Sequence, residues 1–237
     1  MAHKLPRKST NIDMTAMCDV AFLLLTFFML ATKFKPAEPV VVRTPSSVSE
    51  IQVPENTCLL SIDKQGRIFM DYDNKDAKRL LIDSVNTEKG LGLSDEEKET
   101  FIKGAAIGAP FAGLKQYLAS SDEERKMMPN LGIPVPTDSG AYYINNNELA
   151  YWVYHTRLAG DLAAQAAGVA DSAKKPVNIA IKCDAGLQYP GFKAMIKTLQ
   201  RNDLNSYLLV TNVEGVPENT ALYKERFLNE KPSSPAN

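Results

Sequence analysis

Cysteine and histidine are scarce in this sequence, whose 237 residues include only three cysteines and two histidines. So few cysteines exclude the dense disulfide framework of small secreted domains. So few histidines leave little basis for a histidine-rich metal centre. The motifs GxxxxGK[ST], HExxH and GxSxG are also missing, and with them the usual signatures of phosphate-binding loops, zinc proteases and serine hydrolases. We therefore expect no metal, no cofactor and no enzyme activity.

An excess of charge of either sign is missing as well. The 27 lysines and arginines nearly balance the 28 aspartates and glutamates, for a formal net charge of −1. This balance excludes a strongly basic nucleic-acid-binding protein. Hydrophobic residues make up 44% and charged residues 23% of the chain, which is typical of a folded protein. The hydrophobic residues are nevertheless unevenly distributed, because one long run of them lies near the N-terminus.

Residues 14–32, MTAMCDVAFLLLTFFMLAT, form this run, with one charge and neither glycine nor proline. Its length matches the hydrocarbon core of a bilayer at about 1.5 Å per residue. A signal peptide is disfavoured because Lys33, Phe34 and Lys35 stand where a small-residue cleavage site would be expected. A buried core helix is disfavoured because the run is apolar on all sides and flanked by basic residues. We predict an uncleaved transmembrane helix.

Basic residues set the expected orientation of this helix. Residues 1–13 contain three lysines and arginines, and residues 33–35 contain two lysines. The difference favours a cytoplasmic N-terminal tail over residues 1–13, with the rest of the chain on the other side of the membrane.

Asp19 is the single charged residue within the predicted helix. A charged Asp at the centre of a membrane helix costs about 2.5–3.5 kcal/mol on insertion scales, and such residues usually mark proton or ion routes. Its side chain is short for reaching the interface. Thr15, Leu23 and Thr26 share the face of Asp19 at helical spacing. We predict that Asp19 carries protons and that Thr15 and Thr26 form a supporting polar stripe.

The segment NIDMTAMCDV at residues 11–20, followed by the apolar run, resembles the ExbD/TolR family of biopolymer transport proteins. In that family a short cytoplasmic tail leads into one transmembrane helix whose single Asp carries protons. Asp19 occupies that position, and Thr15 matches the family's Thr four residues before it. Asp13 and Ala16 depart from the Asn and Pro that are common there, which affects only the local geometry of the helix start.

Two later segments resemble the family more weakly. VVVRTPS at residues 40–46 is similar to an apolar strand that ends in Leu-Pro-x-Ser, with Thr44 in place of the Leu. Residues 177–213 look like the family's closing strand–helix–strand unit. No counterpart is recognised for residues 74–145.

The resemblance implies a proton-motive-force-driven motor subunit in the bacterial inner membrane. Its implied partners are a multi-span ring protein of the ExbB/TolQ type, a second copy of itself, and a TonB-like transducer that energises outer-membrane transport. A TolR-like role in envelope integrity fits the same residues. A protein of another class, a periplasmic binding or scaffold protein with a passive membrane anchor, is the alternative.

We expect the fold class to be a single N-terminal transmembrane helix followed by an α+β periplasmic domain with a helical insertion. The expected parts are a linker at 33–49, a domain at 50–228 with its insertion at about 74–145, and a disordered tail at 229–237. Within the linker, an apolar segment could form an edge strand that pairs with a partner, or could simply lie on the domain. Its residues are Val40, Val41, Val42 and Pro45.

Local patterns predict the elements of this domain. Strands are expected at 59–63, 67–71, 177–183 and 206–212, and helices at 76–88, 147–166 and 190–202, with two more beginning after Ser94 and Ser121. This order indicates a parallel or mixed sheet. Residues 130–140 are loop-like in composition. Cys58 and Cys183 adjoin strands and could be free thiols or a disulfide. His155 is interpreted as a surface or core-edge residue.

Overall fold

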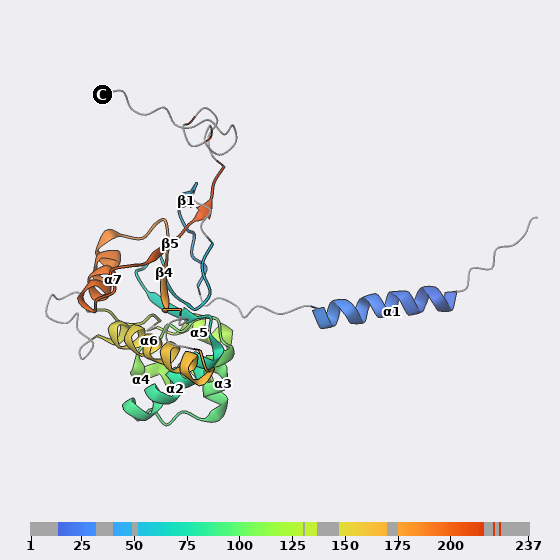
Figure 1. The fold of residues 1–237 in the computed structure, drawn as a ribbon, viewed down its shortest axis with the longest axis horizontal. Coiled ribbons are helices and arrows are strands. Elements are labelled where there is room, and N and C mark those ends of the chain that lie inside the picture. The colour runs from blue at the N-terminus through green and yellow to red at the C-terminus, as the bar shows by residue number, and fades with distance from the viewer. Residues whose placement is uncertain are drawn as a thin grey trace, which may run out of the picture. The chain divides into compact units, whose positions relative to one another are not determined.

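The computed structural model describes residues 14–31, 40–48, 52–129, 131–136, 147–169 and 175–215, together with positions 220 and 223. The chain forms two compact units, Met1–Pro36 and Ala37–Asn237. The first unit contains helix α1 (Met14–Ala31), and the second is a mixed helix and sheet domain (Figure 1). The predicted tails at 1–13 and 229–237 lie outside the described residues.

A four-stranded sheet forms the centre of the second unit. Its strands are β2 (Thr57–Ile62), β3 (Ile68–Tyr72), β4 (Asn178–Cys183) and β5 (Leu208–Val210), in the spatial order β3-β2-β4-β5. β2 and β3 are the predicted antiparallel hairpin, whereas β2–β4 and β4–β5 pair in parallel. The sheet is therefore mixed, which decides between the two arrangements that the sequence allowed.

The tight turn of the hairpin is stabilised by one carboxylate. Asp63 is almost fully buried and accepts hydrogen bonds from the backbone N–H groups of Gln65 and Arg67, at 2.9 and 2.8 Å. It also pairs with the Arg67 guanidinium at 2.6 Å. Gly66 completes the turn at φ 82°, a conformation that side chains disfavour.

Three longer helices supply much of the core. They are α2 (Lys75–Lys89), α6 (Glu148–Ala166) and α7 (Tyr189–Arg201), with α2 packed along α6. Trp152 of α6 is fully buried, and its ring stacks on Phe101 with centroids 6.0 Å apart and lies tilted to Phe111 with centroids 5.2 Å apart. Burial of such large side chains provides the main driving force for folding.

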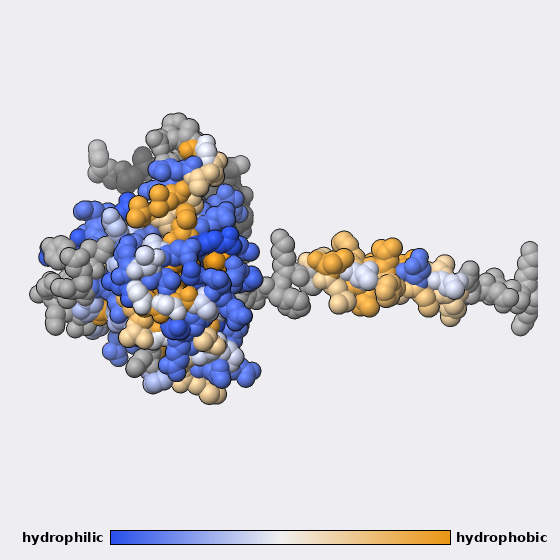
Figure 2. All heavy atoms as spheres, turned by 90° about the horizontal axis from the view of Figure 1, so that it is seen from below, coloured by the Kyte–Doolittle hydropathy of each residue, from blue (hydrophilic) through white to orange (hydrophobic). Residues whose placement is uncertain are grey.

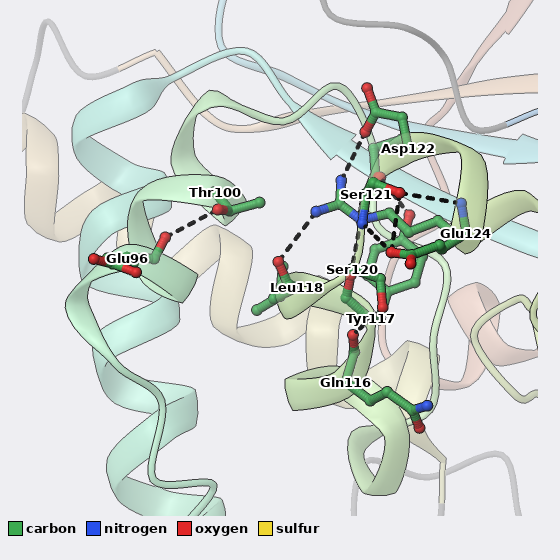
Figure 3. A network of polar contacts seen from close by, with 11 residues as sticks. Glu96, Thr100, Gln116, Tyr117, Leu118, Ser120, Ser121, Asp122 and Glu124 are labelled. Carbon is green, nitrogen blue, oxygen red and sulfur yellow. Dashed lines mark hydrogen bonds and ion pairs between the residues drawn. The ribbon is translucent and has the colours of Figure 1, made fainter.

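The insertion between β3 and α6 contains α2 and three shorter helices, namely α3 (Asp95–Lys103), α4 (Phe111–Ala119) and α5 (Asp122–Met127). The two capping boxes predicted at Ser94 and Ser121 are both present. Figure 3 shows the junction of α4 and α5, where the C=O groups of Tyr117 and Leu118 lie in the last turn of α4. Arg125 donates to both, at 2.8 and 3.1 Å, and so fixes α5 against α4.

Both cysteines of the sheet are free thiols. Cys58 lies opposite Ile179, and Cys183 lies opposite Ile62, so the two cysteines are offset by four residues along neighbouring strands. Four residues of strand correspond to about 13 Å, well beyond the roughly 7 Å that a disulfide can bridge between Cα atoms. The sheet register thus explains why these two residues do not form a disulfide.

Candidate functional site

Helix α1 is the candidate functional element of the first unit. Within the described part of the chain, it is the one helix that is long and apolar enough to cross a membrane. None of its residues is buried within the structure. Figure 2 shows a mostly hydrophobic helix surface that is interrupted by a small hydrophilic region, and Asp19 is the only charged residue of α1.

Thr26 and Asp19 of the predicted stripe differ in their hydrogen bonds. The Thr26 hydroxyl donates to the backbone C=O groups of Phe22 and Leu23, at 3.0 and 2.9 Å, within its own helix. For the Asp19 carboxylate, the structure gives no hydrogen bond or ion pair with any residue that it describes. An apolar helix with one carboxylate of this kind needs a polar environment from outside itself.

The helix continues as one regular element from Met14 to Ala31, so Thr15, Asp19 and Thr26 keep their α-helical spacing. Their positions fall within one side of the helix. The structure therefore places the three predicted residues on one stripe, while their roles in proton movement stay a prediction.

Residues 40–48, here called the strap, belong to the second unit and lie against other residues of it. No strand is present at Val40–Val42, and the first strand is β1 (Ser46–Ser47), which pairs in parallel with β6 (Asn212–Val213). Val41 is 84% exposed, whereas Val42 is only 9% exposed. Within the described part of this segment, strand pairing is thus seen only past Pro45, where β1 meets β6.

Hydrogen bonds fix the strap at two places. The Arg43 N–H donates to the Asp184 carboxylate at 3.0 Å, and the Ala185 N–H donates to the Arg43 C=O at 2.8 Å. Farther along, the Asn212 N–H donates to the Pro45 C=O at 3.0 Å, and its side-chain amide donates to the Thr44 C=O at 3.2 Å. These bonds occupy strap groups that a partner strand would otherwise use, and pairing of residues 40–45 with another protein stays a prediction.

Asp184 stabilises the strap as an ionised group. Its carboxylate accepts the Arg43 N–H and the Gly186 N–H, the latter at 2.8 Å. These two bonds lower the pKa of Asp184 below its usual range. No local pattern indicates this contact, because Arg43 and Asp184 are 141 positions apart in the chain.

Other chemistry receives little support from the geometry. No group of three or more His, Cys, Asp and Glu side chains suited to a metal ion occurs among the described residues. The acidic clusters that begin α3 and α5 are helix caps and first-turn residues, as expected from their sequence.

His155 is a buried residue of α6 rather than an exposed base. Its side chain stacks on Tyr151 with ring centroids 4.0 Å apart and also contacts Tyr154. Its Nε2 atom lies 3.6 Å from the Glu88 carboxylate, and its buried Nδ1 atom has no hydrogen-bond partner. Burial lowers the pKa of His155, Glu88 raises it, and Lys89 lowers it further, for a net decrease.

A pH-dependent stability follows from this environment. The folded protein binds a proton at His155 less readily than the unfolded chain, whose histidine has a pKa near 6.5. The contribution of His155 to the free energy of unfolding is therefore present above that pKa and is lost as the pH falls. We expect His155→Phe to reduce the loss of stability between about pH 7 and pH 5, measured by urea unfolding of the full chain in detergent. Equal pH profiles for the variant and the parent would contradict this assignment.

Comparison with known proteins identifies one region. The family model described as biopolymer transport protein ExbD/TolR matches residues 6–91. The match includes α1, the strap, the β2–β3 hairpin and helix α2. No curated protein matches the chain. No solved structure matches it.

Proposed function

Since residues 6–91 place this chain in the ExbD/TolR family of biopolymer transport proteins, we propose that it is a proton-driven motor subunit of the inner membrane. The family consists of transport subunits that typically work with partners of the ExbB/TolQ type. In our proposal two copies of α1 lie inside a ring of such a partner. The second unit acts in the periplasm on a TonB-like transducer that energises outer-membrane transport.

The observation that carries this proposal is Asp19 on an otherwise apolar helix. No residue that the structure describes forms a hydrogen bond or an ion pair with this carboxylate. A helix that serves only as a membrane anchor has no need of such a group. Inside a ring of helices, polar partner groups or water could stabilise Asp19 in both protonation states. Asp19 of each copy would then bind a proton from one side of the membrane and release it to the other.

The available energy is sufficient for a mechanical step. Moving one elementary charge through 100 mV is worth about 2.3 kcal/mol. This exceeds the thermal energy of about 0.6 kcal/mol several-fold, so each proton can bias a rotation or rocking of the helix. The strap follows α1 in the chain, and its residues Arg43 and Pro45 form hydrogen bonds with later residues of the second unit. Motion of the helix would therefore reach the domain through these contacts.

An exchange of the helix tests the proposal against the passive anchor. In one chimera, residues 14–31 are replaced by a single-pass helix of equal length without ionisable side chains. In a matched chimera, the same foreign helix carries an Asp at the position of Asp19. We expect the first chimera to reach the membrane at normal levels and to lose energy-dependent transport, as measured by uptake of an outer-membrane-transported nutrient.

The two chimeras have different diagnostic value. Full uptake with the helix that lacks a carboxylate would contradict the motor proposal and favour a passive anchor. Partial recovery with the added Asp would identify the carboxylate, rather than helix shape alone, as the active feature.

A further inference from the structure

The insertion covers the outer edge of strand β3. β3 is the end strand of the sheet, and only its inner side pairs with β2. An end strand normally presents unpaired N–H and C=O groups that can pair with another chain. In this protein, two short segments of the insertion, around Ile107 and Ile133, form bridges to that edge.

Backbone hydrogen bonds show that the coverage is direct. The N–H of Met70 donates to the C=O of Ile107, and the N–H of Ile107 donates to the C=O of Met70, both at 2.8 Å. The Ile133 N–H donates to the Ile68 C=O at 2.7 Å. The two segments are also joined to each other by the bond from the Gly132 N–H to the Gly108 C=O, at 2.7 Å. Together they occupy the edge as a neighbouring strand would.

Two glycines allow this close approach. A Cβ atom on Gly108 would lie 2.0 Å from the Phe69 ring, which is far inside van der Waals contact. Gly132 has φ 106°, and a Cβ atom there would lie 2.9 Å from the Cβ of Arg67. Only glycine fits at these positions without displacement of the covering segments.

Further contacts hold the first segment in place. The Lys78 ammonium donates to the Gly104 C=O at 3.0 Å and pairs with Asp71 of β3 at 2.7 Å. The Tyr117 hydroxyl of α4 donates to the Ala106 C=O at 3.1 Å. Helices α2 and α4 therefore both fasten the segment that pairs with Met70.

The isoleucine side chains of the two covering segments are buried as well. Ile107 is 6% exposed and Ile133 is 3% exposed, and both belong to the main hydrophobic core. If the two covering segments moved away, these apolar side chains would be exposed. The backbone N–H and C=O groups along the edge of β3, whose sequence is IFMDY, would be exposed with them. Two such edges can pair with each other about a two-fold axis, because antiparallel pairing of identical strands is self-complementary.

We propose that the insertion is an intramolecular guard that keeps the β3 edge from pairing with the β3 edge of a second copy of this chain. This role is independent of the proton-driven function. It assigns a purpose to a part of the chain that lies mostly beyond the family match, which ends at residue 91. Among the strands that the structure describes, β5 at the opposite end of the sheet has no neighbour on its outer side.

The test removes two of the covering hydrogen bonds, those donated by the N–H groups of Ile107 and Ile133, and so loosens both segments in the full-length protein in detergent. The double variant Ile107→Pro/Ile133→Pro loses two backbone N–H donors, and Ile107→Ala/Ile133→Ala is the matched control that keeps both donors while shortening the same side chains. Oligomeric mass by light scattering and hydrogen exchange of the Met70 amide are measured over a range of protein concentrations.

We expect the Met70 amide of the proline variant to exchange about tenfold faster than in the control at low concentration. At high concentration this amide should become protected again, together with a rise in mass beyond that of the parent. Fast exchange of Met70 without any dependence of mass or protection on concentration would overturn the proposal. Unchanged protection of Met70 at all concentrations would overturn it too.

A second variant covers the case in which the proline protein does not fold. Gly108→Ala forces the segment away from Phe69 and leaves every backbone donor in place. Gly113→Ala in α4 is its control, because a Cβ atom there meets only Pro110, at 3.8 Å. The same two readouts apply, and self-association of Gly108→Ala but not of Gly113→Ala is the expected result. Equal behaviour of the two variants would overturn the proposal.

Discussion

An Asp19→Asn substitution is expected to abolish energy-dependent transport by this protein. Asn has nearly the shape of Asp but cannot bind and release a proton, so the helix keeps its fold and loses its titratable group. If each proton contributes about 2.3 kcal/mol per 100 mV, its loss removes a bias of about 50-fold in an equilibrium constant. We expect uptake to fall by at least that factor, measured as nutrient uptake in cells that carry the variant as their only copy.

Thr26→Val tests the supporting polar stripe separately from the ionisable group. The Thr26 hydroxyl already bonds to the C=O groups of Phe22 and Leu23, so its removal leaves no unpaired group. We expect normal membrane levels and most of the uptake to remain. Uptake by the Asp19→Asn protein at the parent level would refute proton carriage by this residue, whatever the outcome for Thr26.

The second large effect is expected for the core of the second unit. Trp152→Ala removes a fully buried ring that contacts Phe101 of α3 and Phe111 of α4. Replacement of a buried Trp by Ala typically costs about 3–5 kcal/mol. The free energy of unfolding should fall by that amount, and the loss should loosen α3 and α4 first, because the ring joins both to α6.

Urea unfolding of the full chain in detergent, followed by circular dichroism, measures this effect. Trp152 is the only tryptophan of the chain, so fluorescence cannot be used to compare the variant with the parent. Tyr154→Ala on the same helix is the control, since its side chain is 52% exposed and should change stability by less than about 1 kcal/mol. A stability of Trp152→Ala close to that of the control would show that the aromatic cluster is not needed.

Elements with strong local signals were predictable from the sequence. The helices predicted to begin after Ser94 and Ser121 start there with capping boxes, and the strands predicted at 59–63 and 67–71 form the hairpin. The apolar run of α1 was equally clear. In each of these cases, neighbouring residues contain the information, through caps, turns or periodicity.

Features that depend on distant residues were not predictable. Helix α4 begins after Pro110 without a side-chain cap, so no local motif indicates its start. The loop-like composition of residues 130–140 conceals Ile133, which bridges to β3. The position of β1 depends on β6, 166 residues later in the chain. Such pairings arise from tertiary packing, which a single sequence does not display.

The strap also determines where a pulling force on its N-terminal end would enter the second unit. Its hydrogen bonds follow one another along the chain, at Arg43, at Pro45 and then at Ser47, whose C=O accepts the Glu214 N–H at 2.9 Å. Tension applied to the N-terminal end of the strap would reach the Arg43–Asp184 contact before the contacts at Pro45 and Ser47, because Arg43 comes first along the chain. The strap would then transmit load to the segment after β4 before it transmits load to β6.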